Sequence, residues 1–360
     1  MAGAVTLVAT KDAVVSLEAV GYSDLAAKVP MKTDALFWIA SMTKPLTAAA
    51  FMMLVDEGKV NLDDPVEKYL PEFKGQWVAT EQDADHTLLT KPTHPITIRN
   101  ILSHTAGLPM ISPLEKFPDS PISLEMRVRS YAMLPLKHQP GVAYEYSNAD
   151  LNTIGRIIEV ASGMPYDKFM DERLFKPLGM KDSTFWPDDE QSSRLAKSYR
   201  PNAANTELLE AKPPYILPLN QSTCPAVPAG GLFSTASDLS IFCRMLLAGG
   251  VFDGKRYISE ESLKQMTSTQ TGDILINGNG LEGYGLGWVV RKQSSNGDPF
   301  NDDGLSKGAF GHKGAYKTAM WIDPEKQLVM IFLMQIAGGG RQAEAISPVF
   351  LKAATAKFGN

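Results

Sequence analysis

The pattern of hydrophobic and polar positions divides the chain into β-rich ends and a helical middle. Near the N-terminus, two short runs of β-branched and small apolar residues, 4–9 and 13–20, are separated by Thr10-Lys11-Asp12, which is typical of a hairpin. Strand character returns in three runs near the C-terminus, at 285–290, 310–322 and 328–335. Asp323-Pro324-Glu325-Lys326 provides a turn between the last two runs, so consecutive antiparallel strands are expected there.

Helical spacing dominates the residues between these ends. The first helix is predicted from Ser41 to about Asp56 and is apolar on nearly every side, so it should lie buried in the middle of a domain, with Gly58 ending it. Residues 74–95 are polar and without period, which favours a long surface loop. Further helices are predicted at about 96–103, 123–134, 149–162, 165–175, 237–248, 259–267 and 342–357.

This order of elements predicts an α+β fold. One antiparallel sheet would be built from both termini and flanked by the first and last helices, with a mostly helical domain inserted between them. We expect residues 1–58 and 284–360 to form the discontinuous sheet domain and residues 59–283 the helical domain. The active site is expected between the two.

Composition excludes several classes of function. The chain has 360 residues, of which 44% are hydrophobic and 21% charged, as in soluble globular proteins. Its net charge of -5 comes with no basic stripe, which argues against a nucleic-acid partner. No apolar run reaches the roughly 18–20 residues that cross a bilayer. Met1 leads directly into a predicted strand without a signal peptide, although a removed leader would leave the compartment open.

The chain offers no sign of a metal centre or a cofactor. Cys224 and Cys243 could form a disulfide, but two buried free thiols are the expected state. No Cys/His cluster has metal-ligand spacing, and no glycine-rich phosphate loop is present. We therefore expect neither metal nor cofactor, and the sequence leaves the oligomeric state undetermined.

The candidate chemistry begins with Ser41-Met42-Thr43-Lys44. A serine and a lysine three residues apart share one helical face, and a hydroxyl beside an amine at a helix start can form an activated nucleophile. A serine in this position can also be a simple helix cap. Two further groups follow in order, Tyr146-Ser147-Asn148 and His312-Lys313-Gly314. Each of their members alone could be structural: a core tyrosine, an asparagine in a turn or at the cap of the following helix, or a strand histidine.

Taken together, these groups resemble the signatures of the serine β-lactamase and penicillin-binding family, particularly its class C and family VIII carboxylesterase branches. Those signatures are Ser-x-x-Lys, Tyr-x-Asn and a Lys/His/Trp-x-Gly triad. The likeness covers nearly the whole chain and includes five further stretches: Gly21-Tyr22-Ser23-Asp24, 102–108, 229–235, Tyr284-Gly285-Leu286-Gly287 and Asp323-Pro324.

The resemblance implies a role for each matching residue. Ser41 would be the nucleophile that forms an acyl-enzyme, and either Lys44 or Tyr146 would take its proton, a choice that the sequence leaves open. The resemblance also implies an oxyanion hole and substrate contacts, formed by the backbone N–H groups of Ser41 and Ala315, by Asn148 and His312, and by Gly314, where the backbone can approach a ligand closely.

The third triad departs from the lactamase pattern. His312 stands where lactamases carry the lysine that binds a substrate carboxylate, and a neutral imidazole is a poorer clamp at pH 7. Lys313 is expected to point away from the pocket because adjacent strand residues face opposite sides, and Lys317 has no assigned role. His104, in a family-like Ser-His-Thr stretch, is expected to make a structural hydrogen bond.

The sequence therefore predicts a serine hydrolase that cleaves small carboxylic esters through an acyl-enzyme on Ser41. The same site could serve a β-lactamase, a D-alanyl peptidase or an acyltransferase, with a small ester or a β-lactam-like molecule as substrate. A protein that keeps the fold for binding or assembly, without turnover, is the alternative of a different class.

Overall fold

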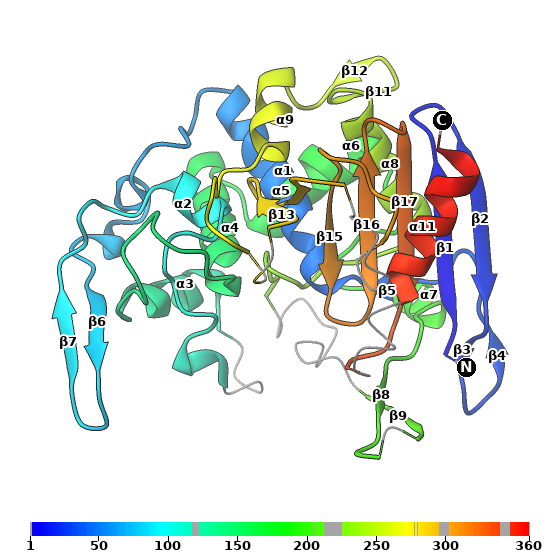
Figure 1. Cartoon of the computed structure of the whole chain (residues 1–360), viewed down its shortest axis with the longest axis horizontal. Helices are drawn as coiled ribbons and strands as arrows, with labels where there is room; N and C mark the ends of the chain where they lie inside the picture. The colour runs from blue at the N-terminus through cyan, green and yellow to red at the C-terminus, as the bar shows by residue number, and fades with distance from the viewer. Residues whose placement is uncertain are drawn as a thin grey trace.

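A large antiparallel sheet forms one side of the molecule (Figure 1). The computed structural model describes residues 2–116, 122–204, 206–211, 225–276, 278, 280–294, 302–338 and 346–359. Within them the strand order is β13-β14-β15-β16-β17-β1-β2. The strands are β1 (Ala4–Ala9), β2 (Val14–Val20), β13 (Glu282–Tyr284), β14 (Val289–Arg291), β15 (Phe310–Gly314), β16 (Thr318–Asp323) and β17 (Leu328–Met334). Strand β1 pairs with β17, Ala4 facing Met334, which confirms the prediction of one antiparallel sheet from both termini.

Two helices cover opposite faces of this sheet. Helix α11 (Ile346–Phe358) packs in front of it in Figure 1, and α8 (Ala236–Leu247) packs behind. Successive residues of β1 alternate between the two layers: Leu7 belongs to the core on the α8 side, and Val8 to the core on the α11 side. This period of two lets strands that are apolar throughout bury both faces.

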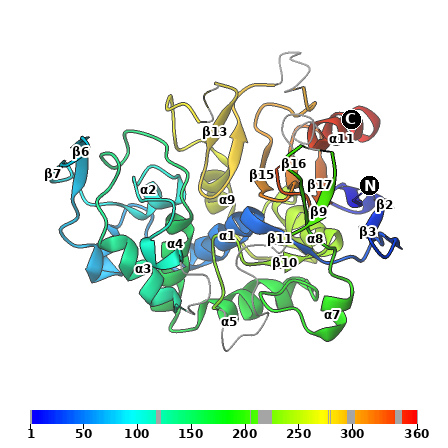
Figure 2. The same ribbon diagram turned by 90° about the horizontal axis from the view of Figure 1, so that it is seen from below.

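Helix α1 (Thr43–Asp56) lies between the sheet and the helical side (Figure 2) and packs against α4 and α9. Twelve of its fourteen residues are buried, as its apolar sequence predicted. Helix α4 (Asn148–Ser162) packs on α1 and is itself contacted by α2, α3 and α5. These and the other helices are α2 (Ile98–Leu102), α3 (Leu124–Ala132), α5 (Tyr166–Met170), a π-helical turn (Asp171–Phe175), α6 (Lys176–Leu178), α7 (Asp189–Ser193) and α9 (Glu260–Thr267).

Short pairs of strands and 3₁₀ turns complete the description. The small strands are β3 (Tyr22–Asp24), β4 (Val29–Pro30), β5 (Phe37–Trp38), β6 (Val78–Gln82), β7 (Thr87–Thr90), β8 (Tyr199–Pro201), β9 (Leu208–Glu210), β10 (Phe233–Ser234), β11 (Val251–Phe252) and β12 (Lys255–Arg256). The 3₁₀ turns are η1 (Ala40–Met42), η2 (Val66–Lys68), η3 (Pro71–Phe73) and η4 (Pro113–Lys116). Within the described ranges, no helix is long and apolar enough to span a membrane.

Three local predictions were wrong. Residues 74–95 contain the hairpin of β6 and β7 instead of a plain loop, because main-chain pairing needs no hydrophobic alternation when both strands lie exposed at the surface. Only residues 289–290 of the run 285–290 belong to a strand, β14, and residues 285–288 form the turn between β13 and β14, where Gly287 has a φ of +80°. The run 310–322 is two paired strands, and Lys317, with a φ of +63°, ends the turn that separates them.

The division into two domains stays a prediction. Helix α8, which lies in the range expected to be helical domain, covers the sheet in the structure. Its Cys243 is a buried free thiol, as expected, whereas Cys224 lies outside the described residues. The predicted last helix is present over 346–358, and residues 342–345 of that prediction are also outside the described residues.

Candidate active site

Ser41 lies in a strained turn between strand β5 and helix α1. Ala40, immediately before it, has a φ of +48°, a conformation that residues with a Cβ rarely adopt and that needs support from the surroundings. Thr43 gives that support: its Oγ1 donates to the carbonyl of Ala40 at 2.7 Å and accepts from the N–H of Leu232 at 3.2 Å. The α-helix begins at Thr43, so Ser41 sits in the 3₁₀ turn that precedes it and not in the first α-helical turn.

Lys44 is fully buried, with its amine beside the Ser41 hydroxyl. Nζ lies 3.1 Å from Ser41 Oγ, 2.8 Å from Asn148 Oδ1 and 2.7 Å from the carbonyl oxygen of Ala229. Burial lowers the pKa of Lys44 to about 7, against the opposing influence of Asp150. Ser41 and Lys44, three residues apart in the sequence, are thus in contact in the structure. The lysine is held by groups from α4 and from the loop before β10.

Tyr146 joins the same cluster from the loop before α4. The amine of Lys44 lies 4.7 Å from the centre of its ring, and its hydroxyl interacts with Ser41. Burial raises the pKa of this phenol, and the hydrogen bond with Ser41 acts in the opposite direction. The ring packs against His104, with centroids 4.6 Å apart, and lies 6.1 Å from the ring of His312.

Asn148 is the first residue of α4, so its side chain has a fixed direction. Ser147 caps the helix by accepting from the N–H of Ala149 at 3.0 Å, and its own hydroxyl donates to the carbonyl of Pro109 at 2.6 Å. The cap of α4 is therefore Ser147, and Asn148, the residue for which a cap role was considered, is the first helical residue. The capped helix start presents Asn148 to Lys44.

Strand β15 approaches the Ser41 turn from the other side. An added Cβ on Gly314 would lie 2.4 Å from the carbonyl oxygen of Ile39, so only glycine fits at this crossing. Ala315, the next residue, lines the same pocket as Ser41. The structure thus brings together the two residues whose N–H groups are candidates for the oxyanion hole.

His312 lies behind this surface. It is 4% exposed, its Nδ1 is 2.8 Å from the carbonyl of Lys313, and its Nε2 is 3.1 Å from the hydroxyl of Tyr284. Burial, with Lys44 nearby, lowers the pKa of His312 to about 3, so the imidazole is neutral. Lys313 is exposed, on the opposite face of the strand from His312, as the alternation predicted.

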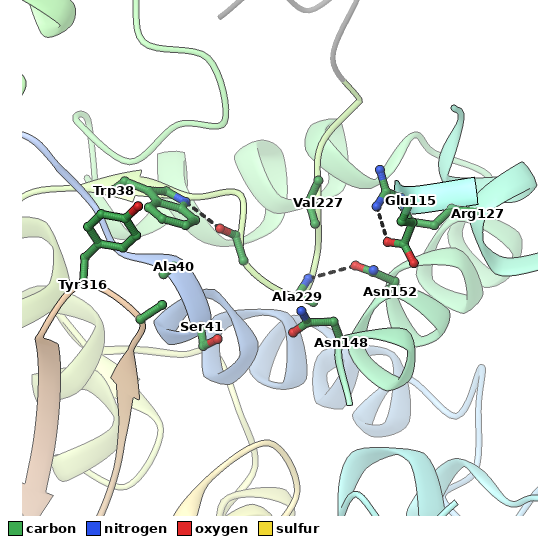
Figure 3. Close-up of a pocket in the computed structure, with 12 residues that line it drawn as sticks. Trp38, Ala40, Ser41, Glu115, Arg127, Asn148, Asn152, Val227, Ala229 and Tyr316 are labelled. Carbon is green, nitrogen blue, oxygen red and sulfur yellow. Dashed lines mark hydrogen bonds and ion pairs between the residues drawn. The ribbon is translucent and has the colours of Figure 1, made fainter. Parts of the chain in front are cut away.

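A pocket of about 130 Å³ opens beside Ser41 (Figure 3). Its near end is formed largely by apolar groups, including the rings of Trp38 and Tyr316. At its far end the guanidinium of Arg127 forms an ion pair with Glu115, both largely buried. The remaining lining residues are Ala40, Asn148, Asn152, Val227, Ala229, Gly230 and Ala315.

Several residues of this region were missed by sequence reasoning. Asp150 is fully buried and bonded to His104, Tyr284 bonds His312, and the Glu115–Arg127 pair closes the pocket. Asp150 lies two residues after Asn148, and a carboxylate within an apolar helical run could have indicated a buried functional residue. The pair of Glu115 and Arg127 left no such signal, because both residues look like ordinary surface charges in sequence.

No group of three or more His, Cys, Asp or Glu side chains among the described residues is arranged to hold a metal ion. What the site offers instead is a hydroxyl, a buried amine and a phenol in mutual contact. Together with the α+β fold, this arrangement defines a serine hydrolase of the β-lactamase and transpeptidase type.

Comparison with known proteins supports the same class of protein. The Beta-lactamase family profile matches residues 1–354, and the chain belongs to that family. The family acts on small ester, peptide or β-lactam substrates.

Curated relatives cover most of the chain. Protein Rv1367c of Mycobacterium tuberculosis is 36% identical over 356 residues, which is 93% of this chain and 86% of that protein. A putative D-alanyl-D-alanine carboxypeptidase of Salmonella typhimurium is 27% identical, over 87% of this chain and 72% of its own length. Among solved structures, EstCE1, described as a hydrolase with promiscuous acyltransferase activity, superimposes with a TM-score of 0.78 at 24% identity. It covers 98% of this chain and 93% of its own, and the likeness concerns the fold.

Proposed function

We propose that this protein hydrolyses small carboxylic esters through an acyl-enzyme on Ser41, with Lys44 as the base. The contact of Lys44 Nζ with Ser41 Oγ, at 3.1 Å inside a buried site, is the observation that carries the proposal. A free serine hydroxyl is a weak nucleophile, and a buried neutral amine beside it is a suitable acceptor for its proton.

The hydrogen bonds around Lys44 fit a neutral amine that accepts from Ser41. A neutral amine has two N–H donors and one lone pair, and two of its three neighbours, Asn148 Oδ1 and the carbonyl of Ala229, can only accept. The lone pair is then left for the third neighbour, the O–H of Ser41. Tyr146 is the less suitable base because burial raises the pKa of its phenol, whereas burial lowers the pKa of Lys44 to about 7.

The reaction then proceeds in two balanced steps. Ser41 Oγ attacks the ester carbonyl while its proton passes to Lys44, and the C–O bond to the alcohol breaks as that proton is returned to the leaving alkoxide. Tyr146 keeps its proton and can donate a hydrogen bond to the oxygen of the leaving alkoxide. Water next attacks the acyl carbonyl and gives a proton to Lys44; the bond from the acyl carbon to Ser41 Oγ breaks, Lys44 returns that proton to Oγ, and the acid is released. The N–H groups of Ser41 and Ala315 would stabilise both tetrahedral intermediates.

The environment of His312 favours an ester over a β-lactam or a D-alanyl peptide. A substrate of the latter kinds carries a carboxylate, which needs a cation or a free donor at the third triad. With Nδ1 at the carbonyl of Lys313 and Nε2 at the hydroxyl of Tyr284, the neutral imidazole has no N–H left to offer. The relative named as a D-alanyl-D-alanine carboxypeptidase makes peptide cleavage the activity to compare directly.

The test is burst kinetics with a short-chain p-nitrophenyl ester, together with intact-mass detection of the acyl-enzyme. The wild-type protein should show a burst and one added acyl group, and Ser41→Ala should show neither. Ser193→Ala, which changes an exposed serine of α7, is the matched control and should behave as wild type. A cephalosporin and a D-alanyl dipeptide are assayed in parallel, and an alcohol acceptor is added to detect acyl transfer. Absence of ester turnover in the wild-type protein would refute the proposal, and faster turnover of the dipeptide would replace it.

A further inference from the structure

A second pair of ionisable side chains lies beneath the site, closed off from solvent. His104 is 0% and Asp150 1% exposed, and His104 Nδ1 is 2.6 Å from Asp150 Oδ2. Their two outer atoms, His104 Nε2 and Asp150 Oδ1, have no hydrogen-bond partner in the part of the chain that the structure describes. The mechanism above uses neither residue, and a buried pair of this kind requires an explanation.

The pair supports the segment that carries Tyr146. His104 follows α2 with a φ of +56°, and its carbonyl accepts from the N–H of Glu145 at 2.8 Å. Its ring packs on one side of the Tyr146 ring, which also lies 4.7 Å from the amine of Lys44. The histidine thus contacts the 144–148 segment through both its backbone and its side chain.

The hydrogen bonds determine which atom holds the shared proton. The N–H of Ser147 points at His104 Nδ1 over 3.3 Å, so the single lone pair of this nitrogen faces Ser147 and is shared between this long contact and the short one to Asp150. A nitrogen with a lone pair cannot also donate to Asp150. The contact of 2.6 Å therefore requires Asp150 to be the donor, which only a protonated carboxylic acid can be.

We propose that Asp150 is held as a neutral carboxylic acid by its hydrogen bond to His104. The neutral pair then acts as a positioning device for the 144–148 segment and places no negative charge near Lys44.

The electrostatic surroundings agree with this assignment. Burial raises the pKa of Asp150 well above its usual range, and burial lowers the pKa of His104 well below its usual range. The titratable groups that face the pair come from four elements and their flanking loops: Lys44 on α1, Tyr144, Glu145 and Tyr146 before α4, Tyr284 on β13 and His312 on β15. Only Lys44 among them can become a cation near neutral pH, because His312 is itself neutral.

The consequence for catalysis rests on the proposed function. An ionised Asp150 would favour the ammonium form of Lys44 and remove the base from Ser41. A neutral Asp150 leaves Lys44 free to be an amine. His104 would therefore act on the reaction through other residues, without touching the substrate.

The first test needs no activity and so separates this proposal from the preceding one. Infrared spectra of the wild-type protein at pH 8 should contain the C=O stretch of a protonated carboxylic acid. Labelling with ¹³C-aspartate should move this band, and Asp150→Asn should remove it. If Asp150→Asn does not fold, the isotope shift in the wild-type protein still shows a protonated aspartate, and Asp238, whose pKa is raised to about 6 by burial, is mostly ionised at pH 8. A wild-type spectrum without such a band overturns the proposal.

The second test compares isosteric variants by pH profile. Asp150→Asn retains a neutral donor to His104 Nδ1, so acylation should keep the wild-type kcat and the same midpoint of its acid limb. A midpoint lower by about one pH unit or more would mean that an anion had been removed, and would refute the proposal.

His104 is tested with one conservative and one apolar substitution. His104→Gln can still accept from Asp150 and should recover most of the wild-type kcat, whereas His104→Leu should lower kcat about 100-fold with KM little changed. His138→Gln is the matched control, a partly buried histidine that lies outside the Tyr146 cluster and whose Nε2 also has no hydrogen-bond partner among the described residues. Equal losses in His104→Gln and His104→Leu would contradict the role of the acceptor atom.

Discussion

Gly314 crosses Ile39 so closely that its own hydrogen is the only substituent that fits. An added Cβ would lie 2.4 Å from the carbonyl oxygen of Ile39 and 2.1 Å from Thr318 Oγ1. This crossing fixes the distance between the tip of the β15–β16 hairpin and the turn that carries Ser41. The candidate oxyanion hole is assembled from these two segments, so its geometry depends on the absence of a side chain.

Gly314→Ala should therefore reduce catalysis more than it reduces stability. The hairpin must move by about an ångström to relieve the contact, and a displacement of that size can cost about 100-fold in kcat. Steady-state kinetics with a short-chain ester, paired with a thermal melt, checks this. Gly280→Ala is the control, because an added Cβ there meets nothing within 4 Å. Wild-type kcat in Gly314→Ala would show that the crossing does not set the geometry.

The rate of acylation should rise with pH through about 7. Burial lowers the pKa of Lys44 to about 7, so the amine is free to accept a proton above this pH and is protonated below it. His312 cannot produce the same limb, because its pKa is lowered to about 3. Pre-steady-state bursts between pH 5 and 9 measure the midpoint. A limb displaced to the ordinary range of lysine, near about 10.4, would show that burial does not perturb this amine.

Replacing His312 should change substrate preference and leave acylation intact. The imidazole is buried behind Tyr146 and bonded to Tyr284, so His312→Ala opens space near the pocket without touching Ser41 or Lys44. The ratio of kcat/KM between acetate and hexanoate esters is the measurement, with covalent labelling of Ser41 as the check. Tyr284→Phe removes only the hydroxyl and separates the hydrogen bond from the volume. Complete loss of labelling in His312→Ala would assign the histidine to the nucleophilic machinery.

The ion pair of Glu115 and Arg127 at the end of the pocket should stabilise the fold, and the effects of replacing its two members should be strongly coupled. Glu115 is almost fully buried, so Arg127→Met leaves an uncompensated carboxylate and should cost about 3–5 kcal/mol in the free energy of unfolding. The double variant Arg127→Met/Glu115→Gln should recover much of this loss. Urea unfolding of the single and double variants measures the coupling. Additive losses would indicate that the two charges act independently.

The sequence was most informative where local pattern and tertiary structure agree. The apolar circumference of α1 required burial, and the hairpins at both termini required one sheet, because such strands have no other way to bury their surface. Ser41 and Lys44 could be paired from spacing alone, since three residues along a helical turn bring their side chains together.

Contacts between distant segments could not be read in the same way. Asp150 and His104 meet only because α4 packs beside α2, and no local rule links positions that far apart. The same holds for Glu115 and Arg127. The strand boundary near Lys317 was missed because two apolar strands joined by a tight turn have nearly the same hydrophobic profile as one longer strand. Near Gly287, the apolar residues Leu286 and Trp288 gave the turn itself the profile of a strand.

The central place of β1 has a consequence for how the protein is made. Ala4–Ala9 lies between β2 and β17, so one of its two hydrogen-bonding edges is completed by residues 328–334, which are synthesised long after it. Through most of synthesis, the β1–β2 hairpin exposes an apolar strand with an open edge, the kind of surface that chaperones bind and that nucleates aggregation. The sheet, and with it the support beneath the Ser41 turn, cannot be complete until β17 has been synthesised.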